Sequence, residues 1–229
     1  MDAVRLPRPV VHVHPLQHYG FGQKPEKAWK TETARLAGME SRYAEEGFAR
    51  RTVEAVLLVV EHGHPHLLLL QARGGCATAA LCLTLRLTRA LPQLDSQTFA
   101  LPGGRLKPGE EESEGLKRKL SSKLAPAGSG AGVAPPAWEV GELLATWTRP
   151  HFEPNLYPYC PPHVTRPVET RHLYLVHLPE RCFFAVPRNQ KLVAVPLFEL
   201  HGNAAKFGTQ VAAVPALLSR FLLHLHTPE

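Results

Sequence analysis

The segment FALPGGRLKPGEEESEGLKRKLSSKL, residues 99–124, decides the fold of this chain. Its pattern predicts a short strand over residues 99–102, a glycine turn at Gly103-Gly104 and a helix that begins near Glu111. Leucines at every fourth position give that helix one apolar face: Leu116, Leu120 and Leu124. A strand, a glycine-rich loop and an acidic helix in this order often hold a phosphate or a metal–phosphate complex.

The same segment resembles the Nudix box, the sequence motif of enzymes that hold Mg²⁺ against a diphosphate. The motif reads Gly, five residues, Glu, seven residues, then Arg-Glu-aliphatic-x-Glu-Glu-x-Gly-aliphatic. The residues of this chain that match the motif are Gly104, Glu110, Arg118 and Leu120. The positions where glutamates of the motif are replaced are Lys119, Ser122 and Lys123.

These replacements change what the helix can bind. In active Nudix enzymes the helix carboxylates hold Mg²⁺, which needs hard oxygen ligands. Residues three and four apart share one helix face, and here that face offers the ammonium groups of Lys119 and Lys123 and the hydroxyl of Ser122. Because like charges repel, metal-dependent hydrolysis is predicted to be lost, with no metal or cofactor bound. The two lysines either accept a phosphate or are solvated surface residues.

Composition and charge narrow the class of protein. A length of 229 residues and a hydrophobic content of 44% suit one globular domain with appendages. The net charge of +6 permits a polyanionic partner. No apolar run reaches transmembrane length and the N-terminus lacks a signal-peptide core, so we expect an intracellular protein without membrane segments. The cysteines form no CxxC pair, so neither a zinc knuckle nor a disulfide framework is expected.

Strands alternate with helices along the chain, which predicts an α/β protein, a Nudix-type α/β/α sandwich with an N-terminal extension and one inserted loop. The extension, with one helix, occupies residues 1–49, and the Nudix-like domain occupies residues 50–229. Within that domain, residues 72–96 are interpreted as the inserted loop, because a compact α/β unit joins its strands in a few residues. Residues 125–137, rich in Gly, Ala and Pro, are interpreted as a flexible linker.

Further predictions concern segments outside the box. Residues 192–200, LVAVPLFEL, are predicted to form a strand, and residues 211–225, VAAVPALLSRFLLHL, a closing helix. The alternation of valine and histidine over residues 11–14 predicts a short edge strand. No carboxylate or cysteine accompanies these histidines, so they are not assigned a metal. The histidines of residues 62–66 alternate with Gly and Pro and are interpreted as an exposed hairpin tip.

Several segments resemble a narrower family, the small Nudix-like subunit of pre-mRNA cleavage factor I. They include PLQHYGFGQK (residues 15–24), FEPNLYPYCPPH (152–163) and FFAVPRNQKLVAVPLFEL (183–200). Such segments are not general features of Nudix proteins, so the resemblance is specific. Together the matching segments cover most of residues 15–222, in order, apart from the inserted loop and the linker.

The resemblance implies a non-catalytic subunit that binds single-stranded RNA containing UGUA in the pre-mRNA cleavage and polyadenylation complex. It implies a homodimer, a larger partner subunit with an RNA-recognition domain, contacts with other polyadenylation factors, and a location in the nucleus. Single-stranded bases can be splayed out, stacked on aromatic rings and read on their Watson–Crick edges, so such binding is physically reasonable.

By motif, the resemblance assigns RNA contacts to Arg35, Glu54, Phe99, Leu101, Gly103, Phe207 and Gly208. Phe99 matches the stacking aromatic, although the match is one residue short there and Thr98 competes for the position. At Phe207 the family usually has tyrosine, so the phenolic hydroxyl is absent here. Each side chain also has a purely structural interpretation: Phe99 in the core, Arg35 in a surface ion pair, and Glu54 at a strand end.

Two other functions remain open. The first is a divergent Nudix hydrolase of dinucleoside polyphosphates or capped RNA, in which acidic residues 110–114 restore the metal site. The second is an interaction scaffold that recruits the partner subunit but has lost contact with RNA because of the insertion at residues 72–96.

Overall fold

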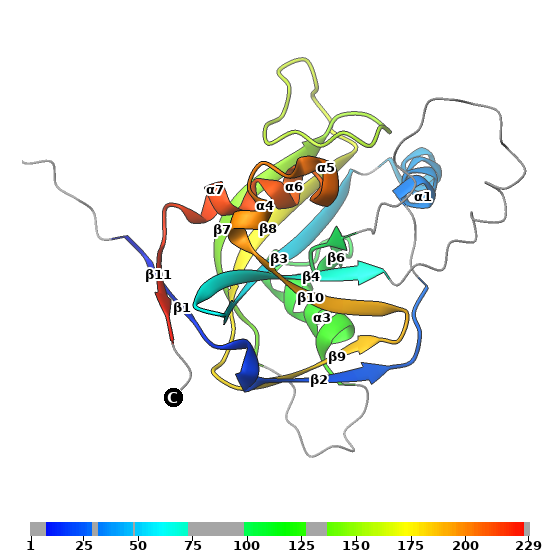
Figure 1. Ribbon diagram of the computed structural model, residues 1–229. Coiled ribbons are helices and arrows are strands. Elements are labelled where there is room, and N and C mark those ends of the chain that lie inside the picture. Colours follow the sequence, from blue (N-terminus) through cyan, green and yellow to red (C-terminus); the bar gives the residue numbers. More distant parts are fainter. Residues whose placement is uncertain (1–7, 29–31, 48, 73–98, 127–136, 227–229) are drawn as a thin grey trace, which may run out of the picture.

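The computed structural model describes residues 8–28, 32–47, 49–72, 99–126 and 137–226 (Figure 1). The inserted loop assigned to residues 72–96 and the linker assigned to residues 125–137 therefore lie outside the described residues, apart from their ends. Among the helices of the described ranges, none combines the length and the apolar character needed to cross a membrane.

A seven-stranded mixed sheet forms the centre of the molecule, with β10, β4, β3, β8 and β7 in that order. β3 and β8 run parallel, and the other neighbours along this path are antiparallel. The short strands β5 and β6 extend the sheet beside β4 and β3. The strands are β3 (Arg50–Glu61), β4 (His64–Ala72), β5 (Phe99–Ala100), β6 (Gly103–Arg105), β7 (Glu139–Arg149), β8 (Glu169–His177) and β10 (Gln190–Pro196).

β3 shows why this sheet is covered on both faces. Successive side chains of a strand point to opposite faces, and almost every residue of β3 is buried. Val56, Leu58 and Val60 belong to one hydrophobic cluster. Ala55, Leu57 and Val59, which alternate with them, belong to a second cluster. Two separate cores therefore flank the sheet.

Helices complete the two outer layers. The helix of the box, α3 (Glu112–Leu124), buries Leu116, Leu120 and Leu124 in one core. The other core contains residues of the short helices α4 (Leu197–Leu200), α5 (Ala204–Phe207), α6 (Thr209–Ala212) and α7 (Val214–Leu218). The predicted α/β/α sandwich is thereby confirmed, as is a helix that begins next to Glu111 (Figure 1).

The N-terminal segment is paired with distant parts of the chain. β1 (Val10–Val13) pairs in parallel with β11 (Leu222–Leu225), and β2 (Tyr19–Lys24) pairs in parallel with β9 (Cys182–Pro187). A 3-10 turn, η1 (Leu16–His18), connects β1 to β2, and the helix α1 (Glu32–Glu46) follows. Residues of the predicted 1–49 extension thus share sheets with residues of the predicted domain.

Four predictions of local structure were wrong. Gly103 and Gly104, predicted to form a turn, belong to strand β6, which pairs with β3. Of the exposed hairpin tip predicted over residues 62–66, only His62 and Gly63 form the turn, while His66 is buried in β4.

The strand predicted over residues 192–200 ends at Pro196, which caps α4, because proline has no N–H to continue a ladder. The closing helix predicted over residues 211–225 is divided into the ends of α6, the short α7 and β11. Pro215 lies at the start of α7, where its missing N–H is tolerated, and residues 222–225 pair with β1 instead of continuing the helix.

Candidate nucleic-acid interface

An aromatic pair joins the start of the box to the C-terminal helices. The ring centroids of Phe99 and Phe207 lie 4.9 Å apart with 52° between their planes. Phe207 is buried, whereas Phe99 is half-buried and packs against the core that lies on the same face of the sheet. Nζ of Lys206 lies 4.9 Å from the centroid of the Phe207 ring, so a cation accompanies the aromatic surface. Phe99 therefore has both a structural contact and an accessible part.

Glu54 lies within β3, not at its end, and is only 7% exposed. Its Oε2 accepts a hydrogen bond of 2.6 Å from Nε2 of Gln210, and its Oε1 lies 3.6 Å from Nη1 of Arg171. Gln210 lies in α6, three residues after Phe207. The carboxylate and the aromatic pair are thus held next to each other by one short stretch of chain.

Two glycines allow Glu54 and the Phe99–Phe207 pair to lie next to each other. Gly103 is the register partner of Glu54, and a Cβ at Gly103 would come within 2.1 Å of the Val53 carbonyl oxygen. Only glycine lets β6 approach β3 so closely. Gly208 has φ of 85°, a left-handed conformation that allows the chain to turn from α5 into α6. That turn positions Phe207 and Gln210 on successive helices.

Glu54 is connected through Arg171 to a buried ionic network around Glu169. Glu169, 1% exposed, receives three arginines and one hydroxyl: Arg50 at 3.1 Å, Arg149 at 3.1 Å, Arg171 at 3.0 Å and Thr52 at 2.9 Å. Burial by itself would raise the pKa of the Glu169 carboxyl, but the charges of Arg171 and Arg50 outweigh this and lower the pKa to about 2. Arg171 contacts both Glu169 and Glu54, so the two carboxylates belong to one network.

Glu110 and Arg118, two residues that match the Nudix box, contact each other directly. Arg118 donates from Nε and Nη2 to the two carboxylate oxygens of Glu110, at 2.6 and 2.5 Å, and the Lys107 amide donates to Glu110 Oε2 at 2.7 Å. These hydrogen bonds, that of Arg118 first, lower the pKa of Glu110 to about 2. The carboxylate therefore fastens the loop to α3, using both of its oxygens for contacts within the protein.

The helix face formed by Lys119, Ser122 and Lys123 is cationic. Lys119 lies against Gly104, with Cδ 3.1 Å from the position of a Cβ there. Lys24 donates to the Ser122 carbonyl at 2.8 Å, and Lys27 to the Ser122 hydroxyl at 3.2 Å, so two further ammonium groups lie at this end of α3. The resulting set of positive groups suits an anion rather than Mg²⁺.

Lys123 and Arg35 connect this cationic face to Glu54. Burial lowers the pKa of the Lys123 ammonium to about 8, with the Glu54 carboxylate opposing the shift and the Arg35 guanidinium adding to it. Arg35, half-buried in α1, also acts on the pKa of Arg50, which burial lowers to about 10. Lys123, Arg35 and Glu54 therefore lie close enough to act on one another. At neutral pH Lys123 remains mainly charged.

The remaining acidic residues of the box are engaged elsewhere. Glu112 binds Arg51 at 2.5 Å and His172 at 2.6 Å, and also accepts a hydrogen bond from Tyr174. Burial alone would raise the pKa of Glu112, but these donors lower it to about 2. Glu114 pairs with Lys117 at 3.2 Å. Within the described ranges, the acids of residues 110–114 form no group of three or more potential metal ligands.

The structure places the predicted site residues in two groups. Phe99, Phe207, Gly208, Glu54 and Gly103 form one continuous region, and Leu101, 3% exposed, lies in the core beneath it. Gly104, Glu110, Arg118, Lys119, Ser122 and Lys123 form the neighbouring box, and Arg35 is near enough to Lys123 and Arg50 to lower their pKa values.

Sequence reasoning missed Gln210 and the ion pairs of Arg171. Gln210 follows the Phe207-Gly208 pair by two residues, and that proximity was the only signal for it. Arg171 is the second residue of a strand-like run, TRHLYL (residues 170–175), in which a buried cation is not expected. The lysines at 24 and 27 were also missed, because their contact with α3 joins residues that are distant in sequence.

Comparison with known proteins places the chain in a family. A family model described as a nucleotide hydrolase, of the Nudix class, matches residues 9–221. The chain is 48% identical to pre-mRNA cleavage factor Im 25 kDa subunit 2 of Arabidopsis thaliana, covering 93% of this chain and 94% of that protein. It is 42% identical to cleavage and polyadenylation specificity factor subunit 5 of Dictyostelium discoideum, covering 89% of each.

A third relative, pre-mRNA cleavage factor Im 25 kDa subunit 1 of Arabidopsis thaliana, is 42% identical, with 94% of this chain and 86% of that protein covered. The similarity thus spans nearly the whole chain. The chain belongs to the family of pre-mRNA cleavage factor Im 25 kDa subunits and cleavage and polyadenylation specificity factor subunit 5, and its fold is of the Nudix type.

Proposed function

We propose that this chain is a non-catalytic subunit of the nuclear pre-mRNA 3′-end processing machinery that binds single-stranded RNA containing UGUA. The observation that carries the proposal is the position of Glu54 beside the Phe99–Phe207 pair. An aromatic surface stacks a base, and a fixed carboxylate accepts hydrogen bonds from the N–H groups of a base edge. Both groups are held by α5, α6 and the start of the box.

Binding of UGUA is tested by fluorescence anisotropy at physiological salt. We expect the purified chain to bind an oligonucleotide containing UGUA at least several-fold more tightly than one with the same bases scrambled. Equal affinity for both oligonucleotides would overturn the sequence-specific part of the proposal. Salt must be fixed across the comparison, because cationic groups near the site bind any phosphate backbone.

The residues of the box support the proposal that the chain is non-catalytic. Lysine and serine stand at the positions of the metal carboxylates, and Glu110 and Glu112 are bonded to Arg118, Arg51, His172 and Tyr174. We expect no Mg²⁺-dependent turnover of dinucleoside polyphosphates or of capped RNA. Turnover that Glu110→Gln abolishes would instead support the divergent hydrolase.

The family also supports particular partners. We propose a homodimer that pairs with a larger subunit containing an RNA-recognition domain and contacts other polyadenylation factors. Light scattering coupled to gel filtration measures the first assembly, and co-purification with the larger subunit measures the second. A monomer at micromolar concentration would contradict the homodimer. Co-purification with the larger subunit without any RNA binding would support the scaffold function instead.

A further inference from the structure

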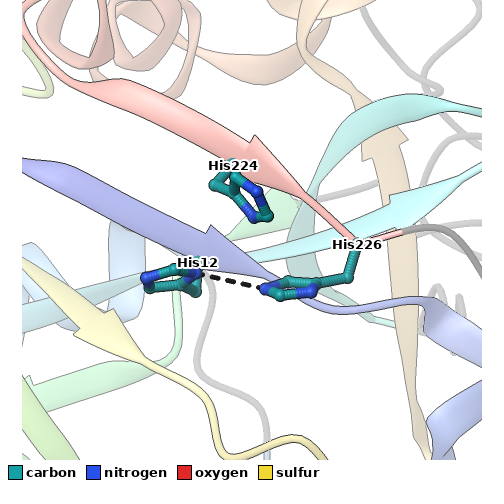
Figure 2. Close-up of side chains that lie close together, drawn as sticks. All are labelled: His12, His224 and His226. Carbon is teal, nitrogen blue, oxygen red and sulfur yellow. Dashed lines mark hydrogen bonds between the residues drawn. The ribbon is translucent and has the colours of Figure 1, made fainter.

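We infer that His12, His224 and His226 form a binding site for a divalent transition metal of the Zn²⁺ class. One ligand nitrogen from each of these imidazoles lies within 4.8 Å of those of the other two. His12 comes from β1, His224 from β11 and His226 from the residue just beyond the end of β11 (Figure 2). No residue of the RNA-binding proposal takes part, so the two proposals are independent.

The backbone fixes where these side chains lie. His12 and His224 are register partners in the parallel pair of β1 and β11, so they project from the same face. His226 lies two residues after His224, and its amide donates to the Val13 carbonyl at 3.0 Å, which continues the ladder past the strand end. On the opposite face Val11 and Val13 are buried in the core. The histidines therefore stand on an anchored pair of strands, with His12 and His224 exposed to solvent and His226 half-buried.

The spacing of the nitrogens suits a metal ion. Nδ1 of His12 and Nε2 of His226 lie 3.2 Å apart. Zinc–nitrogen bonds of about 2.0–2.1 Å in a tetrahedral site separate the nitrogens by roughly 3.3–3.4 Å. For this pair the geometry already matches, and for His224 a rotation of an exposed side chain is enough. Three imidazoles suit Zn²⁺, Cu²⁺ or Ni²⁺ and leave one position for water or another ligand.

A fourth histidine restrains the site. The His14 ring stacks on that of His226, with centroids 4.6 Å apart and planes 13° apart. The His14 carbonyl also accepts a hydrogen bond of 2.9 Å from the Val60 amide, which ties this end of β1 to the central sheet. Bound metal would consequently join residues 212 positions apart, His12 and His224, and hold β1 against β11.

Sequence reasoning assigned no metal to residues 11–14 because no carboxylate or cysteine accompanies these histidines. The other ligands come from the other end of the chain, where HLH at residues 224–226 supplies two more imidazoles. Parallel pairing of β1 and β11 brings the two sets together. The alternative for this cluster is a hydrogen-bonded group of histidines with no affinity for metal.

Titration calorimetry of the untagged full chain with ZnCl₂ tests the inference. We expect binding of one Zn²⁺ per chain and a higher melting temperature with Zn²⁺, but not with MgCl₂, which prefers oxygen ligands. His224→Gln should weaken Zn²⁺ binding by about tenfold or more, by the loss of one ligand. His201→Gln is the matched control, an exposed histidine directly after the end of α4 that should leave binding unchanged.

Titration with CoCl₂ gives a second readout that does not depend on stability. Tetrahedral Co²⁺ at the site should give visible absorption bands that His12→Gln and His224→Gln remove and His201→Gln retains. Equal Zn²⁺ affinity for His224→Gln and His201→Gln would overturn the inference, as would the absence of binding of both ions to the unmodified chain. Either result would leave the cluster as a hydrogen-bonded group only.

Discussion

Gln210 donates a hydrogen bond of 2.6 Å from Nε2 to Oε2 of Glu54, a residue 156 positions earlier in the chain. The bond joins the central strand β3 to the short helix α6, which begins two residues after Phe207 of the aromatic pair. Because Arg171 approaches the other oxygen, the two contacts together keep the Glu54 carboxylate in one orientation. A fixed acceptor of this kind can discriminate between bases, whereas a mobile one adjusts to any of them.

Substitution of this acceptor is expected to reduce base preference. Glu54→Gln removes one negative charge and replaces an acceptor oxygen by an amide donor. We expect the preference for UGUA over scrambled RNA to fall by about 5- to 100-fold, as the loss of one good hydrogen-bonded base contact predicts. Glu61→Gln, at the half-buried end of the same strand, is the control. If both variants retain the preference in anisotropy measurements, Glu54 does not read a base.

Loss of the stacking ring should act differently, because every base has a π-face. Phe99→Ala is expected to weaken binding of UGUA and scrambled RNA alike, by about 5- to 100-fold. Phe21→Ala is the matched control, an aromatic residue that is 50% exposed on β2, in a different sheet. Circular dichroism melts must accompany the titrations, since Phe99 also packs on Phe207. Unchanged affinity in a folded Phe99→Ala variant would exclude stacking at this position.

Local patterns allowed the frame of the molecule to be predicted, and long-range contacts account for what was missed. The leucine spacing of α3 and the uninterrupted apolar run of β3 each lie within one element, so periodicity reveals them. Gln210 reaches Glu54 on another element, and Arg171 joins Glu169 of its own strand to Glu54 on β3, so neither contact follows from local periodicity. Residues 222–225 fit a helix or a strand equally well, and only pairing with β1 decides between them.

The charge of Lys123 should appear in the salt dependence of RNA binding. Lys123→Gln removes one cation near Glu54, so the slope of log K against log salt should become shallower by about 0.7 if this ammonium contacts a phosphate. Because burial lowers the pKa of Lys123 to about 8, the unmodified chain should also lose affinity between pH 7 and pH 9. Lys191→Gln, exposed on β10, controls for net charge. Identical slopes for the two variants would place Lys123 outside the phosphate path.

Acid sensitivity of the fold is expected from Glu169. Its pKa of about 2 in the folded chain lies below the value of about 4.3 for an unfolded glutamate, so the carboxylate stabilises the fold above pH 4.3. That stability is lost as the pH falls toward 2, because the unfolded state then takes up the proton first. The contribution is about 3 kcal/mol for this group, from roughly 1.4 kcal/mol per pKa unit.

Removal of the Glu169 carboxylate is therefore expected to lower the free energy of unfolding at neutral pH. It should also make that free energy depend less on pH below about pH 4. Glu169→Gln leaves Arg50, Arg149 and Arg171 around a neutral amide, and breaking a buried ionic network costs about 3–5 kcal/mol. Urea unfolding at pH 7 and pH 3 measures both effects, with Glu139→Gln, exposed on β7, as control. The difference in unfolding free energy between the Glu169→Gln variant and the control should shrink at pH 3, where protonation begins to weaken the same network in the control. A difference that stays constant from pH 7 to pH 3 would mean that the lowered pKa of Glu169 does not contribute to stability.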